Sequence, residues 1–532
     1  MTLGELIARL PDARLTGDAS VSVQSVTHDS RHAGPESVFV AIRGLATDGN
    51  LYVDAARRKG AVAVVSEQPP QPGGPWVQVG DAREALATLA AAALGDPAQH
   101  LTLVGVTGTN GKTTTTHLID AALRAAGHKV GLVGTIQYRV GDRLAEAART
   151  TPESSDLQEL FRDMVAAGCD HAVMEVSSHS LTLKRVHGLG FRVAVFTNLT
   201  RDHLDFHGDM DGYFEAKRTL FDTLLRKDGH AVVNAADDRA AELVAVSRGT
   251  VWTFGIDRSS GQSPSSLIDD GPLRGLVDRP SGQSPSSPID DGPLRGLVDR
   301  PADLRATDVS LSLGGTRFRA HTPVGELVVE SPLLGRFNVE NLLAALGASL
   351  ALGLPSSVAV RGLQSVTGVP GRLERVSAGQ DFTVIVDYAH TDDALKNLLE
   401  TVRELKPRRV ITVFGCGGDR DRSKRPLMGA VASRLSEAVV VTSDNPRSEP
   451  PESIIEEILR GMNGGRKAER HVVVDRRDAI AKAFEMAGPG DAVVIAGKGH
   501  ETYQQLRDRT VPFDDRQVAR DLLARLARSG RA

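Results

Sequence analysis

Residues 101–114, LTLVGVTGTNGKTT, decide the fold of this chain. The apolar run Leu101–Val106 predicts a β-strand, TGTNGK predicts a tight loop, and the residues from Lys112 predict a helix ending near Gly127. In such a loop, backbone N–H groups at the helix start bind phosphates, the lysine neutralises them and the next hydroxyl binds Mg²⁺. The loop departs from the general phosphate-loop pattern because Val106 stands where a first glycine is usual. The sequence therefore predicts an ATP site of a special subclass, built from Gly108, Thr109, Asn110, Gly111, Lys112, Thr113 and Thr114.

The length and composition of the chain indicate which classes of protein it can belong to. The 532 residues predict three to four domains, and 63 Lys plus Arg against 67 Asp plus Glu argue against a nucleic-acid coat or a polybasic membrane anchor. Two cysteines indicate a reducing compartment. No secretory signal is visible at the N-terminus, and no apolar run reaches the ~18 residues that span a bilayer. We expect a cytoplasmic monomer without nucleic-acid or membrane partners.

The pattern of short apolar runs and helical stretches predicts three α/β domains, over 1–97, 98–369 and 370–532. Boundaries are indicated by Gly95-Asp-Pro97 and by Gly368-Val-Pro-Gly371. In the last domain the runs are rich in Val and Ile, which predicts parallel strands buried on both faces. These runs are Phe382–Val386, Val410–Phe414, Ala438–Thr442, His471–Val474 and Ala492–Ile495.

A tandem repeat lies inside the middle domain. Residues 260–280 read SGQSPSSLIDDGPLRGLVDRP and residues 281–301 repeat them, with Pro288 in place of Leu267. The repeat holds 7 of the 26 prolines and no periodic apolar face, so it is not a solenoid unit. We interpret 260–301 as a duplicated 21-residue surface-loop insertion that is disordered; a repeated binding motif is the alternative.

Seven further segments accompany the phosphate loop. They are Glu175–His179 (EVSSH), Thr197–Asp205 (TNLTRDHLD), Gly335–Asn341 (GRFNVEN), Asp387–His390 (DYAH), Gly415–Pro426, Asp444–Arg447 (DNPR) and Gly497–Glu501 (GKGHE). Together with TGTNGKTT, they resemble the Mur ligases and, beyond them, the related folylpolyglutamate synthases. The resemblance covers the chain except 260–301. It implies an α/β fold with the three-domain Mur ligase architecture: a domain that binds the UDP-linked substrate, a central P-loop ATPase domain and a Rossmann-like C-terminal domain that binds an amino acid.

The resemblance also implies a reaction, namely ATP-dependent amide formation through an acyl phosphate. ATP would be a co-substrate, with Mg²⁺, two ions in all, as cofactor. The family pattern assigns the catalytic roles to Lys112, Glu175, His203 and Lys217, and the metal contacts to Thr113, Glu175, His203 and Lys217. In the family the matching lysine carries a CO₂-derived carbamate, N6-carboxylysine, which an arginine cannot form. A solvated helix lysine is the alternative interpretation of Lys217.

Substrate contacts follow from the same resemblance. The family members that add the third peptide residue act on UDP-N-acetylmuramoyl-L-alanyl-D-glutamate, and the matching contacts are His28, Ser30, Thr150, Thr151, Ser177 and Arg185. The adenosine contacts would come partly from Asn338, Asp387 and His390. One departure is Asp392, which stands where relatives usually carry a proline after Thr391.

The last domain is expected to choose the amino acid. Its DNPR and GKGHE motifs follow predicted strands, at the carboxyl ends where open α/β sheets bind ligands. Arg447 can bind the extra carboxylate of meso-2,6-diaminopimelate with two hydrogen bonds, Arg420 the other carboxylate and Glu501 an ammonium. An L-lysine-adding enzyme is the alternative, and Arg447 could instead form a structural ion pair. The predicted contacts are Arg420, Asp444, Asn445, Pro446, Arg447, Gly497 and Glu501.

Three rival functions remain for this pattern. A folylpolyglutamate synthase and a ligase that adds D-Ala-D-Ala are opposed by the DNPR and GKGHE motifs and by the Asp29-Ser-Arg31 segment of the first domain. A catalytically inactive scaffold is opposed by the intact Lys112, Glu175 and Lys217.

Overall fold

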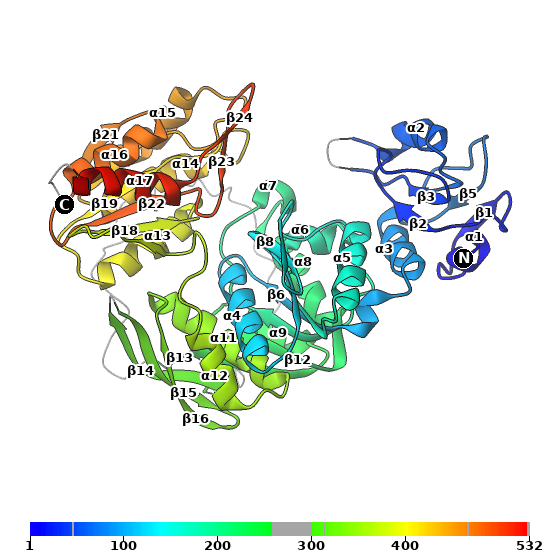
Figure 1. Ribbon diagram of the computed structural model, residues 1–532, viewed down its shortest axis with the longest axis horizontal. Coiled ribbons are helices and arrows are strands. Elements are labelled where there is room, and N and C mark those ends of the chain that lie inside the picture. The colour runs from blue at the N-terminus through cyan, green and yellow to red at the C-terminus, as the bar shows by residue number, and fades with distance from the viewer. Residues whose placement is uncertain (45–46, 258–300, 313, 465–467, 529–532) are drawn as a thin grey trace, which may run out of the picture.

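The computed structural model describes residues 1–44, 47–257, 301–312, 314–464 and 468–528. The predicted insertion 260–301 therefore lies outside the described residues, apart from Pro301. The chain forms three lobes in sequence order, and Figure 1 shows the first and third on opposite sides of the middle one. Across the described residues, the helices are too short or too polar to cross a membrane.

The first lobe is a five-stranded sheet with the order β1-β5-β4-β3-β2. Strands β2 to β5 are parallel neighbours, and β1 is antiparallel to β5. Helix α3 packs on the sheet through a stripe of buried Ala and Leu, as its apolar periodicity predicts. The elements are α1 (Leu3–Ile7), β1 (Arg14–Thr16), β2 (Ser25–Thr27), β3 (Ser37–Val40), η1 (Gly49–Tyr52), α2 (Val53–Arg58), β4 (Ala63–Ser66), β5 (Trp76–Gln78), α3 (Ala82–Ala93) and η2 (Pro97–His100).

The middle lobe is built on an eleven-stranded sheet with the order β16-β15-β14-β13-β12-β11-β6-β10-β7-β8-β9. Its seven central strands, β14 to β7 in that order, run parallel, and antiparallel strands extend both edges. The strands are β6 (Thr102–Thr107), β7 (Val130–Val133), β8 (Gln137–Val140), β9 (Arg143–Glu146), β10 (His171–Glu175), β11 (Phe191–Phe196), β12 (Leu225–Asn234), β13 (Thr250–Ile256), β14 (Leu304–Ser312), β15 (Gly315–Thr322) and β16 (Gly325–Ser331).

Helices cover both faces of this sheet, so its central strands are buried. One apolar core lies under α4, α11 and α12, and the other lies under α5 and α8. The helices are α4 (Lys112–Ala125), α5 (Ser154–Ala166), α6 (Ser178–Thr182), α7 (Leu204–His207), α8 (Met210–Asp222), α9 (Ala240–Val246), α11 (Arg336–Ala351) and α12 (Ser356–Gln364).

The third lobe is a six-stranded sheet, β17-β18-β22-β19-β20-β21, in which only β17 is antiparallel to its neighbour. Helices α13 to α15 pack on one face, and α16 and α17 on the other. The elements are β17 (Glu374–Val376), β18 (Thr383–Asp387), α13 (Asp392–Glu404), β19 (Val410–Phe414), α14 (Lys424–Leu435), β20 (Ala438–Val441), α15 (Pro451–Gly461), η4 (Met462–Gly464), β21 (Glu469–Val472), α16 (Arg476–Met486), β22 (Ala492–Ala496), β23 (Tyr503–Gln505), β24 (Thr510–Pro512) and α17 (Asp515–Arg528).

Two features of the sheets differ from the sequence prediction. The run His471–Val474 was expected to be buried on both faces, but the strand there, β21, begins at Glu469 and is largely exposed. The reason is its place at the edge of the sheet, where it pairs with β20 alone. The antiparallel strands β8, β9, β15 and β16 were not predicted, because their many polar side chains lack the apolar signature of the buried strands.

Candidate active site

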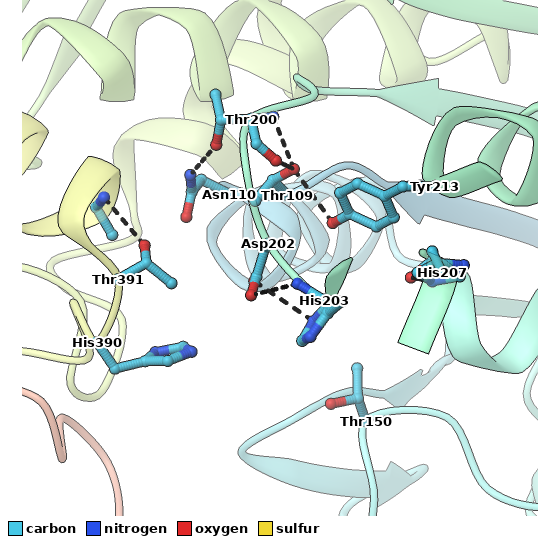
Figure 2. A network of polar contacts seen from close by, with 12 residues as sticks. Thr109, Asn110, Thr150, Thr200, Asp202, His203, His207, Tyr213, His390 and Thr391 are labelled. Carbon is cyan, nitrogen blue, oxygen red and sulfur yellow. Dashed lines mark hydrogen bonds and ion pairs between the residues drawn. The ribbon is translucent and has the colours of Figure 1, made fainter. Parts of the chain in front are cut away.

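A cavity of about 550 Å³ lies between the middle and third lobes. It opens at the carboxyl ends of the parallel strands β6, β10 and β18, where ligands bind in open α/β sheets. Figure 2 shows Asp202 and His203 of the middle lobe facing His390 and Thr391 of the third lobe. The predicted site residues among those that line the cavity are Thr109, Asn110, Gly111, Lys112, Thr113, Thr114, Thr150, Glu175, Ser177, His203, Lys217, Asp387 and His390.

The phosphate loop joins β6 to α4 as predicted. Gly108 and Gly111 have φ angles of 147° and 86°, a backbone conformation that a side chain would strain. The Lys112 ammonium folds back and donates to the carbonyl oxygens of Gly108 and Thr109, both at 2.8 Å. These contacts hold the ammonium over the loop, where an arriving phosphate group would replace the carbonyls as its partner.

Glu175 ends β10 directly behind the loop. Its Oε1 accepts hydrogen bonds from the Thr113 hydroxyl at 3.0 Å and from the Thr135 N–H at 2.8 Å, and its Oε2 accepts from the Thr135 hydroxyl at 3.0 Å. Arg372, at the start of the third lobe, donates to the Thr113 hydroxyl at 3.3 Å. Hydroxyl and carboxylate oxygens are ligands that Mg²⁺ prefers, so this pair fits the predicted cation.

Lys217 lies on α8 and is only 1% exposed. Its ammonium donates to the Gly108 carbonyl at 3.0 Å and lies 4.3 Å from the centre of the Tyr213 ring. Burial drives the pKa of Lys217 well below its ordinary value, and the nearby Lys112 lowers it further. The low pKa favours a neutral amine, which is the form that reacts with CO₂.

A cluster of rings surrounds His203, which lines the cavity. The His203 and Asp202 side chains approach within 3.4 Å, and His179 packs edge-on against His203 at 4.7 Å between ring centres. The ring of His207 bonds to the Ser178 hydroxyl at 2.9 Å. Burial lowers the pKa of His203 to about 3 and that of His207 to about 4, so both rings are neutral near pH 7. A neutral imidazole can bind a cation, as predicted for His203.

The predicted adenosine residues divide into two groups. Asp387 and His390 line the cavity, and the Asp387 carboxylate accepts N–H groups from Leu373 at 2.6 Å and from Ala389 at 2.8 Å. Asn338 is not among the lining residues, because its amide is turned inward. It donates to the Leu334 carbonyl at 2.8 Å and accepts from the Asn341 amide at 2.9 Å. Of the two asparagines in the Gly335–Asn341 motif, Asn341 lines the cavity and Asn338 does not.

Of the predicted substrate contacts in the first two lobes, His28 makes a hydrogen bond that joins these lobes. Arg185 pairs with Glu153 at 2.7 Å and donates to the Thr151 carbonyl at 3.0 Å, and the ring of His28 bonds to the Ser155 hydroxyl at 2.9 Å across the lobes. Thr150 and Ser177 line the cavity, whereas Thr151, Arg185, His28 and Ser30 are not among its lining residues.

The predicted amino-acid contacts form a separate cluster at the carboxyl ends of β20 and β22. The Arg447 guanidinium donates to the Gly418 carbonyl at 2.7 Å, and Arg420 is exposed nearby. Glu501 accepts from the Asn445 amide at 2.8 Å and from the fully buried Lys498 ammonium at 3.0 Å. None of the seven predicted contacts is among the lining residues of the 550 Å³ cavity: Arg420, Asp444, Asn445, Pro446, Arg447, Gly497 and Glu501.

Four residues of these clusters were not singled out by the sequence. Asp202 lies inside the Thr197–Asp205 motif and Tyr213 lies four residues before Lys217, so their proximity to His203 and Lys217 was a signal that could have found them. Lys498 is the lysine of the GKGHE motif, and its burial between carboxylates depends on the fold. Arg372 reaches Thr113 from another domain, 259 residues away, which no local pattern predicts.

Three family models match the chain in order. They are "Mur ligase family, catalytic domain" over residues 22–94, "Mur ligase middle domain" over 106–268 and 295–349, and "Mur ligase, glutamate ligase domain" over 371–499. The middle-domain model leaves 269–294 unmatched, and these residues lie within the tandem repeat. The gap agrees with an insertion at this point.

Individual proteins match over nearly the whole chain. The UDP-N-acetylmuramoyl-L-alanyl-D-glutamate–2,6-diaminopimelate ligases of Solibacter usitatus and Geobacillus thermodenitrificans are 45% and 42% identical to it, over 98% of this chain and 98% and 99% of theirs. A solved structure of a ligase with the same name is 31% identical, covers 99% of both chains and has a TM-score of 0.66.

Proposed function

Because the chain belongs to the Mur ligase family, we propose that it is the ATP-dependent ligase that joins meso-2,6-diaminopimelate to UDP-N-acetylmuramoyl-L-alanyl-D-glutamate. The observation that carries the proposal is that Lys112, Thr113, Glu175 and Lys217 line one cavity, within a chain 45% and 42% identical to ligases of that name. The reaction would belong to the synthesis of peptidoglycan precursors in the cytoplasm, and we propose that the enzyme acts as a monomer.

The chemistry follows from the groups around the cavity. The terminal carboxylate of the glutamyl residue attacks the γ-phosphorus of ATP, ADP leaves, and the product is an acyl phosphate. The amine of the diamino acid then attacks the acyl carbon, inorganic phosphate leaves, and the nitrogen loses a proton. Both steps move negative charge between oxygens, so positioned cations contribute more than a protein nucleophile would. Lys112 supplies such a cation at the phosphate loop, and Arg372 supplies another from the third lobe.

The site fits two Mg²⁺ ions and the carbamate that activity would require. Thr113 and Glu175 would hold one ion; His203 and a carbamylated Lys217 would hold the other. Bound Mg²⁺ neutralises the phosphate oxygens during transfer. The buried Lys217 amine, whose pKa is lowered by burial, can add to CO₂ with loss of one proton, and the resulting anion would lie close to the Lys112 ammonium, which favours it.

Selection of the third residue rests on the cluster in the last lobe. Arg447 and Arg420 offer guanidinium groups to the two carboxylates of diaminopimelate, and Glu501 keeps one carboxylate oxygen, Oε1, for an ammonium. L-Lysine lacks the side-chain carboxylate and would leave one guanidinium without its partner. An L-lysine-adding enzyme is therefore the less favoured assignment.

Phosphate release from ATP tests the proposal directly. We expect release to require both UDP-N-acetylmuramoyl-L-alanyl-D-glutamate and the amino acid, and to be faster with meso-diaminopimelate than with L-lysine at equal concentration. Faster release with L-lysine would contradict the choice of amino acid. Release that is indifferent to the nucleotide-dipeptide would contradict the ligase assignment itself.

A further inference from the structure

A second group of metal-binding side chains lies at the opposite end of the central sheet from the ATP site. His128 precedes β7, and Asp170 and His171 stand at the start of β10. Their potential ligand atoms, one from each residue, all lie within 4.8 Å of one another. Glu175 ends the strand that His171 begins, so the two ends are about 13 Å apart along the chain direction.

The three side chains converge on one carboxylate. One carboxylate oxygen of Asp170 forms a hydrogen bond with Nδ1 of His128 at 2.7 Å. The other oxygen forms a hydrogen bond with Nδ1 of His171 at 2.9 Å. The two rings meet edge-on, with their centres 4.3 Å apart. Both imidazoles therefore turn the same ring nitrogen toward a shared point beside the carboxylate.

The backbone fixes this arrangement. The Asp170 N–H donates to the Lys129 carbonyl at 3.0 Å, and the Thr102 N–H donates to the Asp170 carbonyl at 2.9 Å. The His128 N–H donates to the Leu123 carbonyl at 3.1 Å, which ties His128 to the end of the phosphate-loop helix α4. The backbone of the three residues is thus fixed by three neighbouring strands and a helix. Only their side chains would need to become ordered when an ion binds.

The tautomers of the two rings can also adapt to a metal. A neutral imidazole with Nδ1–H can move that proton to Nε2 and free Nδ1 as a ligand without net charge change.

We propose that His128, Asp170 and His171 form a binding site for a divalent transition ion such as Zn²⁺, separate from the Mg²⁺ sites of the ligase reaction. Two imidazole nitrogens with one carboxylate oxygen suit Zn²⁺ or Ni²⁺, whereas Mg²⁺ prefers oxygen alone. With bonds of 2.0–2.1 Å, a tetrahedral ion needs ligand atoms about 3.3 Å apart. The two Asp170–His separations of 2.7 and 2.9 Å are near that spacing, and all three ligand atoms lie within 4.8 Å of one another.

The remaining coordination positions would be filled by water, because Asp170 is half exposed and His128 one-third exposed. Such an ion would link His128, which follows the end of α4, to Asp170 and His171 at the start of β10. It would therefore stabilise the middle lobe by an amount that grows with the logarithm of the ion concentration above the Kd, without contact with ATP.

The test is a calorimetric titration of the full-length, metal-stripped protein with Zn²⁺ in excess Mg²⁺. We expect His128→Gln/His171→Asn to lose one binding equivalent, or to bind it at least about tenfold more weakly. Zn²⁺ should raise the melting temperature of the wild type more than that of the variant. His100→Gln, an exposed histidine just before β6, is the matched control and should behave as the wild type.

Unchanged stoichiometry and affinity in the double variant would overturn the proposal. Because the ATP site also contains imidazoles, the ion must be located as well. Anomalous diffraction at the zinc edge from wild-type crystals should give a peak between His128, Asp170 and His171. Peaks confined to other places, such as the ring cluster around His203, would refute the site even if the double variant failed to fold.

Discussion

At the scale of single residues, Lys217 is the most demanding side chain of the site. A buried ammonium must find a compensating charge or give up its proton. Among the described residues, the Lys217 ammonium contacts a carbonyl and an aromatic ring; burial and the nearby Lys112 lower its pKa, and the Asp202 and Asp237 carboxylates offset only part of that shift. A neutral amine in this position is costly as an ordinary structural group but suited to carbamylation.

We expect Lys217→Ala to reduce turnover by about 100-fold or more, the cost of removing one electrostatic group at a reacting centre. Added bicarbonate should not restore activity, because alanine has no amine to modify. Phosphate release at saturating substrates measures the effect. The control is Lys227→Ala, an exposed lysine on β12, which should retain wild-type turnover. Turnover near wild type in Lys217→Ala would contradict the assignment.

Lys498 has a comparable place in the amino-acid cluster, although it need not touch the substrate. Its ammonium contacts the Asn445 side-chain oxygen and Glu501, both at 3.0 Å, and lies 3.7 Å from Asp444. It therefore holds three predicted contact residues in one arrangement and acts as a positioning residue.

We expect Lys498→Met to raise the KM for diaminopimelate about tenfold or more while kcat changes much less, because it disturbs binding rather than phosphoryl transfer. Steady-state phosphate release measures the split, and circular dichroism checks that the variant folds. Lys482→Met, on the outer surface of α16, should leave both constants unchanged. A folded Lys498→Met variant with an unaltered KM would show that this network does not position the site. If Lys498→Met fails to fold, the KM of Lys498→Arg, which keeps a cation, provides a second test.

At the scale of elements, the connection between β13 and β14 sets a limit on the tandem repeat. The two strands are parallel neighbours, with Phe254 opposite Leu304. The pairing extends to both flanks, because the Asp257 N–H donates to the Ala306 carbonyl and Asp303 accepts from the Thr253 N–H. Parallel neighbours require a crossover of about a dozen residues or more. The insertion thus lies within an obligatory crossover.

Deletion of one or both copies should therefore have different results. Removing 281–301 leaves 24 residues between Asp257 and Asp303, enough for the crossover, and we expect wild-type melting temperature and turnover. Removing 260–301 leaves three, and we expect loss of β14 pairing with a large fall in melting temperature. A 42-residue Gly/Ser replacement should restore stability. Loss of activity in the single-copy deletion would instead support a binding role for the repeat.

At the scale of the molecule, the local sequence predicted the elements that it specifies by itself. The features that depend on tertiary contacts could not be predicted. The strand–loop–helix unit at Lys112 was predictable because glycine geometry and sequence order specify it locally. The exposed strand β21 was not, since only its place at the sheet edge sets its burial. Likewise, Asp202 could have been found beside His203, whereas the bond from Arg372 to Thr113 arises only when two domains meet.

The predicted amino-acid contacts and the ATP cavity lie apart in the molecule, which predicts a movement of the lobes. The amino-acid cluster around Arg447 and Glu501 does not line the cavity that holds Lys112 and Glu175, yet the amine must reach the acyl phosphate formed there. Direct contacts between the middle and third lobes include Arg201 with Ser423 at 3.0 Å and a long 3.4 Å bond from Asn110 to Asp393. Such polar contacts are readily exchanged when ligands bind.

We expect small-angle scattering to show a smaller radius of gyration when ADP, Mg²⁺ and the tripeptide product are bound, because ligands that contact several lobes favour the closed arrangement. The control is Lys112→Ala, which should bind nucleotide weakly and contract less at the same concentrations. Superimposable profiles for the free and ligand-bound wild type, with binding confirmed by calorimetry, would contradict closure. The amine would then have to reach the acyl phosphate within the arrangement seen in Figure 1.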